Sequence, residues 1–477
     1  MSSDLFAKIR RYFGDYATDK NIASVVELSK LPRFVAEYLA TYFSHKYPGD
    51  WERRLREFVS EYYYDVGEKE LLKSRLVEDK VVRILDELRV WVELGSGEYR
   101  GIIRALDVSD AVVPREIANA YPITMVTGAW GLLTLVYDPS KIPRNRRGEA
   151  LASPIIVSEF KPLQTASADL NVLREARQYF TFEEWVDVLV NTLGLNHEIY
   201  SLRQKLLILS RLIPLVEENV NLMEFGPRAT GKTYTYRNVS AYTRIIAGGL
   251  ISPAALIYNL RTGMPGEIAV RDCVVFDEIS RVRFQNPDEM MAKLKDYMES
   301  SQFERGRQKG SSGCSLVFMG NVEVEKRPEG YVPVEDLTYE LPKFMRESAF
   351  IDRIHGVLPG WEIPKIGRSK AFLSKGYGIA SDYFSEAMHT MRKISYATEI
   401  EKYVELQGSI TVRDEKSVKK TVSALLKLLF PDEAFDKKEL KQVVEIAVEM
   451  RQRVRDWLHK LSPEEFPLNT LSFSIRG

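Results

Sequence analysis

The spacing of apolar residues changes along the chain and separates segments of different expected structure. Over residues 4–75, apolar residues recur every three or four positions, as in LPRFVAEYLATYF (31–43) and WERRLREFVSEYYY (51–64), which predicts helices. Between residues 78 and 165, runs rich in Val, Ile and Leu alternate with turns that contain Gly, Pro and Asp, which predicts about five β-strands. That number of strands suits a small closed barrel of the OB-fold type.

Helical spacing returns over residues 168–220, where Thr181 and Glu184 form a capping box that marks the start of one helix. Residues 117–137 carry no charge, and this length of helix would be close to the thickness of a bilayer. Asn, Pro, Gly and Thr interrupt the stretch, however, and its alternation from Met125 onward predicts a buried strand with its lead-in. We therefore expect no membrane span.

Composition and charge narrow the class of protein. The 67 Lys and Arg residues balance 67 Asp and Glu, which argues against a globally basic DNA-coating protein but permits local basic loops. Hydrophobic residues at 45% and charged residues at 28% are typical of a soluble globular protein. The two cysteines, Cys273 and Cys314, are too few for a disulfide framework, and residues 1–15 do not resemble a secretion signal. We therefore expect a cytoplasmic location.

The strongest chemical signal is a phosphate-binding loop that follows a short apolar run. Its residues fit the pattern GxxxxGK[ST] in full: Gly226, Pro227, Arg228, Ala229, Thr230, Gly231, Lys232 and Thr233. Backbone N–H groups of such a loop wrap a phosphate chain, so glycine is needed where a side chain would collide with it. Lys232 would reach the β- and γ-phosphates of ATP, and the Thr233 hydroxyl would bind Mg²⁺. The alternative is a glycine-rich turn without a ligand.

A second motif supports the first. The segment RDCVVFDE (271–278) reads as a buried strand that ends in two carboxylates. Asp277 would lie beside the phosphate-binding loop and hold Mg²⁺, and Glu278 would orient and polarise the attacking water. An acidic helix cap is the alternative, but it does not explain why Asp277 follows Lys232 by 45 residues, the separation that P-loop ATPases of this type require.

With these motifs in order, the central region resembles an AAA+ ATPase. The resemblance implies that the strand CSLVFMGN (314–321) lies between the two motif-bearing strands and that its terminal Asn321 contacts the γ-phosphate or the lytic water. It also implies that Arg353 is an arginine finger for the neighbouring subunit's site, an Asp352–Arg353 surface pair being the alternative. A further sensing arginine would be Arg413, with Lys419 as its rival.

Longer stretches resemble MCM-type helicases and, more closely, the BrxL family of BREX phage-defence systems. The segments that carry the closer resemblance are PIIVSEFKPLQ, FTFEEWVDVLVNTLGL, RLIPLVEENVNLMEFGPRATGKTYTY, VVFDEI, KDYMESSQFERGR, FMGN, DRIHGVLPGWEIPK and TVSALLKLLFPD. The resemblance implies an ATP-hydrolysing ring of hexamers, single or paired, that encircles double-stranded DNA and meets other BREX proteins. A protein unfoldase or protease motor and a nucleotide-switched scaffold remain alternatives. Longer family members continue into a Lon-like domain near Gly477, so we expect no peptidase activity from these residues.

Two basic loops are candidates for contact with DNA, because clustered Lys and Arg bind phosphate backbones. The first contains Lys141, Arg144, Arg146 and Arg147. The second contains Arg305, Arg307 and Lys309, which would share one face if they lay in one extended strand. The family resemblance places these loops in an N-terminal collar and a pore hairpin, and two solvated basic turns are the alternative.

The expected fold is an α/β AAA+ P-loop ATPase core with a helical lid, preceded by an N-terminal helical bundle and an OB-like β-barrel domain. The expected domains are a helical domain (1–76), the OB-like β domain (77–166), a helical connector (167–220), the ATPase core (221–370), and the lid with a C-terminal tail (371–477).

Overall fold

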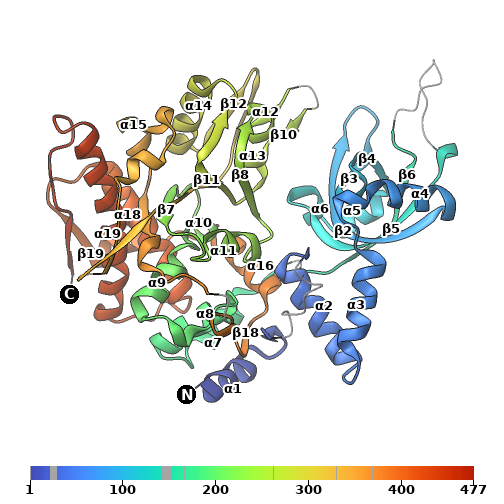
Figure 1. Cartoon of the computed structure of the whole chain (residues 1–477), viewed down its shortest axis with the longest axis horizontal. Coiled ribbons are helices and arrows are strands. Elements are labelled where there is room, and N and C mark those ends of the chain that lie inside the picture. Colours follow the sequence, from blue (N-terminus) through green and yellow to red (C-terminus); the bar gives the residue numbers. More distant parts are fainter. Residues whose placement is uncertain are drawn as a thin grey trace. The chain divides into compact units, whose positions relative to one another are not determined.

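The computed structural model describes residues 2–21, 30–141, 152–165, 167–260, 263–328, 330–367 and 370–476. Contacts divide the chain into two compact units (Figure 1). One contains Met1–Lys20, Asp169–Ile379 and Phe384–Gly477, and the other contains Asn21–Ala168 and Ala380–Tyr383. This division differs from the five expected domains, because the first 20 residues and the connector belong to the same unit as the ATPase core.

The smaller unit combines three helices with a closed β-barrel. The helices are α2 (Arg33–Lys46), α3 (Trp51–Tyr62) and α4 (Lys69–Asp79), and the strands are β2 (Val81–Glu93), β3 (Glu98–Ile103), β4 (Val108–Val113), β5 (Ala129–Tyr137) and β6 (Ile155–Pro162). The barrel closes in the order β2-β3-β4-β6-β5. The five-stranded closed barrel that the alternating pattern predicts is therefore confirmed.

The uncharged stretch before β5 is partly helical. It contains α5 (Arg115–Ala120) and α6 (Ile123–Val126), so the strand predicted from Met125 begins instead at Ala129. Pro122 precedes the first turn of α6, and Gly128 has a φ of +88°, a conformation that glycine adopts readily and that ends the helical turn. No helix among the described residues has the length and apolarity needed to cross a bilayer.

The larger unit begins with helices that precede its central sheet in the sequence. They are α1 (Ser2–Phe13), α7 (Leu170–Arg177), α8 (Phe182–Thr192), α9 (Leu202–Ser210) and α10 (Ile213–Val216). The capping box at α8 is confirmed, since Thr181 and Glu184 exchange hydrogen bonds of 2.9 and 3.2 Å. A short strand β1 (Ala17–Asp19) pairs with β18 (Tyr377–Ile379).

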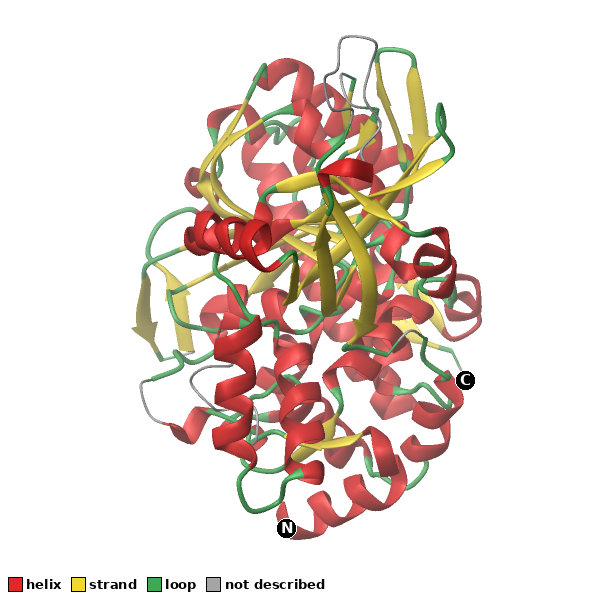
Figure 2. Ribbon diagram, turned by 90° about the vertical axis from the view of Figure 1, so that its right-hand side faces the viewer, coloured by secondary structure: helices red, strands yellow, loops and turns green. Residues whose placement is uncertain are grey.

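A parallel five-stranded sheet forms the centre of this unit. Its strands are β7 (Leu222–Gly226), β8 (Thr243–Ile251), β11 (Cys273–Phe284), β14 (Ser315–Asn321) and β17 (Gly356–Pro359), in the order β17-β7-β14-β11-β8. The strand β14 thus lies between β7 and β11, as the AAA+ resemblance implied. Since all five strands are parallel, their carboxyl ends meet at one edge. Helices and strands are mixed throughout, as expected for an α/β protein (Figure 2).

The strands β7, β14 and β17 and the first half of β11 are buried, whereas β8 is largely exposed or half-buried. Phe276 and Phe318 stack at 5.0 Å between ring centroids, and Phe225 meets Trp457 at 5.6 Å.

The remaining helices of this unit include α11 (Lys232–Asn238), α14 (Pro287–Ser300), α15 (Ser348–Ile351), α16 (Ser381–Met391), α17 (Ala397–Tyr403), α18 (Val412–Leu429) and α19 (Lys437–Leu461). Between β8 and β11 lie α12 (Pro253–Leu256), β9 (Tyr258–Asn259), β10 (Met264–Pro265) and α13 (Glu267–Val270). Small antiparallel pairs are formed by β15 (Val324–Arg327) with β16 (Gly330–Pro333) and by β19 (Val404–Gln407) with β20 (Ser472–Ile475).

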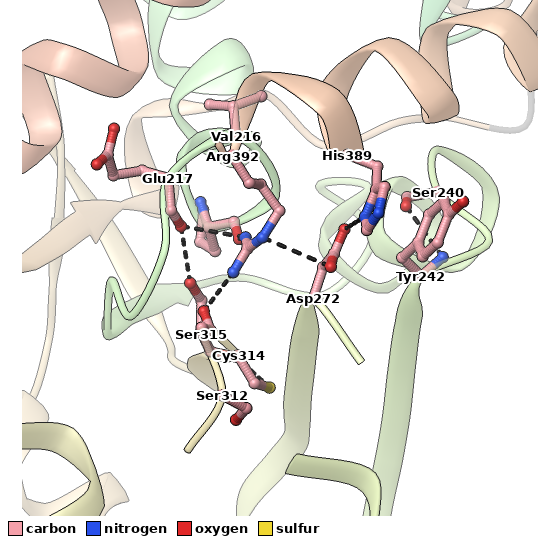
Figure 3. A network of polar contacts seen from close by, with 12 residues as sticks. Val216, Glu217, Ser240, Tyr242, Asp272, Ser312, Cys314, Ser315, His389 and Arg392 are labelled. Atoms are coloured by element: carbon pink, nitrogen blue, oxygen red, sulfur yellow. Dashed lines mark hydrogen bonds and ion pairs between the residues drawn. The ribbon is translucent and has the colours of Figure 1, made fainter. Parts of the chain in front are cut away.

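A polar network ties the C-terminal helices to the amino edge of the sheet (Figure 3). His389 Nδ1 lies 2.7 Å from Asp272 Oδ2, directly before β11. Arg392 donates to the carbonyl oxygens of Pro214, Glu217 and Gly313. Arg392 is buried, and its contacts fix the chain just before β11 and β14, at the edge of the sheet opposite the carboxyl ends of the strands.

Candidate nucleotide-binding site

The predicted phosphate-binding loop connects the end of β7 to the start of α11 at the carboxyl edge of the sheet. Gly226 lies against Gly360, and a Cβ on Gly226 would come within 2.5 Å of the Gly360 carbonyl carbon. Gly231 has a φ of +81°, and its Cβ would lie 3.0 Å from Ile366 Cδ1. Gly226 is thus required by the close approach of Gly360, and Gly231 by its left-handed backbone conformation. With both in place, the loop has the shape that wraps a phosphate group.

Lys232 is buried against its own loop. Only 5% of the residue is exposed, and Nζ donates to the carbonyl oxygens of Gly226 at 2.8 Å and Pro227 at 2.9 Å. Burial lowers the pKa of the Lys232 ammonium to about 8. A cation held only by neutral carbonyls is suited to exchange them for an anionic phosphate.

A hydroxyl and a carboxylate, either of which could be a metal ligand, meet at the end of β11. Thr233 Oγ1 donates to Asp277 Oδ2 at 2.7 Å, although 44 residues separate them in the sequence. The Asp277 Oδ1 atom accepts the backbone N–H of Glu278 at 2.9 Å. A hydroxyl and a carboxylate are the hard oxygen ligands that Mg²⁺ prefers, so the residues present fit the expected ion.

Glu278 takes an unusual backbone conformation beside this pair. Its φ is +50°, in the left-handed region that non-glycine residues rarely adopt, and the β8–β11 ladder is irregular between Asp277 and Val282. Strained conformations of this kind cluster at functional sites. The Glu278 carboxylate is partly exposed and accepts a hydrogen bond from Arg281 Nη1 at 3.0 Å.

Asn321 ends β14 directly opposite Gly226 in the β14–β7 register. The next residue, Val322, donates its backbone N–H to the Gly226 carbonyl at 3.2 Å. A cavity of about 830 Å³ opens here, and its lining includes Pro227, Arg228, Asn321, Glu323, Glu340 and Lys365. The structure therefore brings Asn321 together with the phosphate-binding loop at one cavity.

A buried ion pair beneath the loop was missed by sequence reasoning. Arg211 and Glu224 are 0% and 1% exposed in their side chains, and Arg211 Nη2 lies 2.7 Å from Glu224 Oε1. The Arg211 Nη1 atom has no hydrogen-bond partner in the part of the chain that the structure describes, and it lies 3.7 Å from where a Cβ on Gly231 would be. The available signal was Glu224 itself, because an acid inside the apolar strand LMEFG requires a buried partner.

Arg353 lies at the opposite edge of the sheet from its own phosphate-binding loop. It lies three residues before Gly356, the first residue of β17. Gly356 pairs with Leu222 at the amino end of β7, whereas the phosphate-binding loop begins at Gly226, at the carboxyl end of β7. Four residue steps along a strand separate the two edges by roughly 13 Å. Arg353 Nη1 donates to the Ala349 carbonyl at 2.6 Å, and its Nε lies 3.5 Å from Glu299. The alternative of an Asp352–Arg353 pair is not what the structure has, since the Asp352 carboxylate binds Arg413 and Arg451.

Arg413 lies with Arg353 at this amino edge. It occupies the first turn of α18, and its guanidinium binds Asp352 and Glu299, each at 2.7 Å. Glu299 therefore contacts both arginines. The rival Lys419 binds Glu401 and Glu415 instead, at 2.7 and 2.5 Å.

Of the two basic loops predicted to contact DNA, the structure describes the second but only the first residue of the first. Arg144, Arg146 and Arg147 lie outside the described residues, and Lys141 is the last residue of a 3₁₀ turn, Pro139–Lys141. The second loop is a hairpin of β12 (Gln302–Arg305) and β13 (Gln308–Ser311).

The prediction that Arg305, Arg307 and Lys309 share one strand face is wrong. The chain reverses at Gly306, whose φ is +60°, so Arg305 and Lys309 lie on different strands and their side chains face opposite sides. Lys309 faces Glu304, with an Nζ–Oε2 distance of 3.3 Å, and Arg305 donates to the Tyr258 carbonyl.

Comparison with known proteins identifies relatives over nearly the whole chain. Residues 155–472 match the model "Lon-like protease BrxL-like, ATPase domain", and residues 11–137 match "BREX system Lon protease-like protein BrxL N-terminal". The chain is 31% identical over 468 residues to the Lon-like protease BrxL of Escherichia coli O9:H4 (strain HS), which covers 97% of this chain and 66% of that protein. It is also 31% identical over 469 residues to the Lon-like protease BrxL of Bacillus cereus (strain H3081.97), with 97% and 68% covered. The chain spans about two thirds of the length of these relatives.

Proposed function

The chain belongs to the BrxL family, and from that premise we propose that it hydrolyses ATP as a ring-shaped motor on double-stranded DNA in BREX defence. The observation that carries the ATPase part is the 2.7 Å contact between Thr233 and Asp277. This contact joins the two motifs that the sequence predicts for a magnesium–nucleotide site. A chance phosphate-loop pattern would not require a carboxylate from a distant strand at that position.

The side chains at the carboxyl edge suggest a division of roles. When Mg²⁺ is bound, it supplies neutralisation of the charge that develops on the phosphate oxygens. Thr233 and Asp277 would hold it, and Lys232 would leave the carbonyl oxygens of its loop to donate to the phosphates. Glu278 would accept the proton of the attacking water, and Asn321 would orient that water.

Completion of the site by a neighbouring subunit is supported by the position of Arg353. Arg353 lies at the amino edge of the sheet, away from its own phosphate-binding loop, and 19% of its side chain is exposed, so that a second copy of the chain can reach it. Arg413 shares Glu299 with Arg353, so we propose that the two arginines enter the neighbour's site together. Because each site would then need two subunits, a closed ring such as a hexamer satisfies every site equally.

Contact with duplex DNA is supported by the hairpin β12–β13. This hairpin directly precedes β14, the strand that ends at Asn321, and 78% of the Lys309 side chain is exposed. Arg307 lies in the turn between the strands. A basic hairpin joined to the hydrolytic strand offers a path by which phosphate contact could alter the site. Lys141 and the arginines that follow it are proposed as a second contact, and other BREX proteins are proposed as partners.

The proposal is tested by measuring ATP binding and ATP hydrolysis separately. We expect Lys232→Ala to weaken nucleotide binding, and Glu278→Gln to keep ATP bound while it abolishes turnover. Duplex DNA should stimulate the wild-type enzyme. Wild-type turnover in Glu278→Gln would remove the water-polarising role from that residue, and stimulation by an unfolded protein rather than by duplex DNA would favour the unfoldase alternative.

The shared site is tested by mixing two inactive variants. Arg353→Ala should fold and bind ATP but hydrolyse it poorly. When it is mixed with Lys232→Ala, some interfaces pair an intact Lys232 with an intact Arg353, and activity should partly return. If the two variants co-assemble and activity does not return, Arg353 does not act across the interface.

A further inference from the structure

Arg451 on α19 is a fully buried cation with an unusually complete set of partners. Its side chain is 0% exposed. Nε donates to Asp414 Oδ1 and Nη2 to Asp352 Oδ1, both at 2.7 Å. Nη1 donates to two backbone carbonyl oxygens, those of Asp352 at 3.1 Å and Ile354 at 2.6 Å.

These two carbonyls belong to the residues on either side of Arg353. The chain is fixed again one residue later, where His355 N donates to the Asn221 carbonyl at 2.7 Å and His355 Nδ1 accepts the Asn221 N–H at 3.0 Å. The backbone that carries Arg353 is therefore held on both sides. Its own guanidinium is held by one hydrogen bond, from Nη1 to the Ala349 carbonyl at 2.6 Å, since Nε lies 3.5 Å from Glu299 and has no hydrogen-bond partner among the described residues.

The carboxylates around Arg451 require a cation at this position, which an apolar side chain could not supply. Asp414 is 0% exposed in its side chain and also accepts hydrogen bonds of 2.9 Å from the Thr411 backbone N–H and hydroxyl. Burial opposes ionisation of Asp414, but the Arg451 charge and these hydrogen bonds hold the pKa of the carboxyl below its usual range. Removing the cation would leave the buried Asp414 carboxylate with the longer Arg455 contact of 3.4 Å, whereas Asp352 would keep Arg413 at 2.7 Å. An apolar residue in place of Arg451 could hold neither carbonyl.

We propose that Arg451 is a positioning residue for ATP hydrolysis: it holds the carbonyls on both sides of Arg353 and so fixes the direction in which Arg353 reaches the neighbouring subunit's phosphate-binding loop. This inference rests on the proposed function, in which Arg353 acts across a subunit interface. Arg451 itself touches no reacting atom. Its effect is on orientation, to which catalysis is sensitive at the level of about 1 Å.

The substitution Arg451→Lys tests the proposal, because lysine keeps a cation beside Asp414 but has no planar fork to hold both carbonyls. Arg392→Lys is a matched control, since Arg392 is also buried and holds three backbone carbonyls of the same unit, next to Asp272 rather than Arg353. We expect Arg451→Lys to lower kcat by about tenfold or more with the KM for ATP and the ring assembly unchanged. We expect Arg392→Lys to shift the melting temperature without a comparable loss of kcat.

A double-mutant cycle separates positioning from general structure. If Arg451 acts through Arg353, Arg451→Lys should cause no further loss of kcat in an Arg353→Ala background. Mixing Arg451→Lys with Lys232→Ala should restore activity, because the Lys232→Ala subunit supplies a correctly held Arg353. If Arg451→Lys does not fold, Asp414→Asn serves instead, since it weakens the contact that holds Arg451 and leaves the Asp352–Arg413 ion pair in place.

Three results would overturn the inference. Equal losses of kcat in Arg451→Lys and Arg392→Lys would assign both arginines a structural role. A further loss of kcat on adding Arg451→Lys to Arg353→Ala would show that Arg451 acts by another route. Wild-type turnover in Arg353→Ala would instead remove the finger from the proposed function, so the two failures are distinguished by the single variant at Arg353.

Discussion

Arg281 Nη1 lies 3.0 Å from Glu278 Oε2, so the carboxylate proposed to polarise water is held by a guanidinium three residues further along the chain. Glu278 is the residue with a φ of +50°, and the Arg281 side chain is 67% exposed. In the proposed function, Glu278 would exchange this contact with Arg281 for one with the attacking water.

The first prediction is that Arg281→Ala raises basal ATP hydrolysis. An exposed ion pair of this kind stabilises the held state by about 0.2–1 kcal/mol, so its loss should raise the rate without DNA by up to about fivefold. Stimulation by DNA should shrink accordingly. Arg283→Ala is the control, since Arg283 is also exposed on β11 and lies two residues beyond Arg281. An unchanged or lower basal rate in Arg281→Ala would show that the contact does not restrain Glu278.

The second prediction concerns Thr233 and magnesium. Thr233→Ser keeps the hydroxyl that faces Asp277, whereas Thr233→Val keeps the shape and removes the oxygen. We expect Thr233→Ser to hydrolyse ATP at near the wild-type Mg²⁺ requirement. In Thr233→Val the Mg²⁺ concentration for half-maximal hydrolysis should rise by about tenfold or more, as expected for loss of one ligand or its support. Identical Mg²⁺ titrations for both variants would exclude this hydroxyl as a ligand.

The sequence was most informative where the determinants of structure are local. The sequence alternates between apolar and polar residues within β2 to β6, and it is continuously apolar before the phosphate-binding loop and before Asp277. These patterns indicate which side chains are buried, and burial determines where those strands form. The face prediction for Arg305 and Lys309 failed because it treated the segment as one strand. Gly306 was the visible signal for a turn there.

Contacts between distant segments were beyond local reasoning. The first helix joins the larger unit through Lys8, which lies 2.7 Å from Glu184, and through Tyr12, which stacks on Tyr179 at 3.9 Å. Nothing in the periodicity of residues 4–75 indicates those partners. Arg413 and Glu299 are 114 residues apart and still meet. Individual site residues were thus predictable from motifs, whereas the residues that hold them required the fold.

The third prediction separates the roles of the hairpin's basic residues. Arg307 and the exposed Lys309 are free to meet phosphates once Lys309 leaves Glu304, whereas Arg305 anchors the hairpin to Tyr258. Arg307→Gln with Lys309→Gln should reduce the slope of log K against log salt for duplex DNA by about 2, close to one unit per phosphate contact. Arg305→Gln should leave the slope near wild type but weaken the stimulation of hydrolysis. A larger change of slope in Arg305→Gln than in the double variant would reverse this assignment.

The last prediction is that acid destabilises the turn that carries Arg353. His355 is buried, and its Nδ1 accepts the Asn221 N–H, so the ring is neutral in the folded chain. Burial, reinforced by the charges of Lys420, Arg451 and Lys416, lowers the pKa of His355 well below 6.5. The unfolded chain therefore binds a proton near pH 6.5 that the folded chain does not, and stability falls as the pH drops below that value. The slope from this one group is at most about 1.4 kcal/mol per pH unit.

Melting temperatures between pH 5 and 8 measure this effect. In His355→Asn the side-chain oxygen can accept the Asn221 N–H but cannot be protonated, so the fall in melting temperature below pH 6.5 should be shallower than in the wild type. His45→Asn is the control, because His45 is exposed on α2 and its loss should leave the pH profile unchanged. If His355→Asn and the wild type lose stability in parallel as the pH falls, protonation of His355 is not the cause of the acid sensitivity.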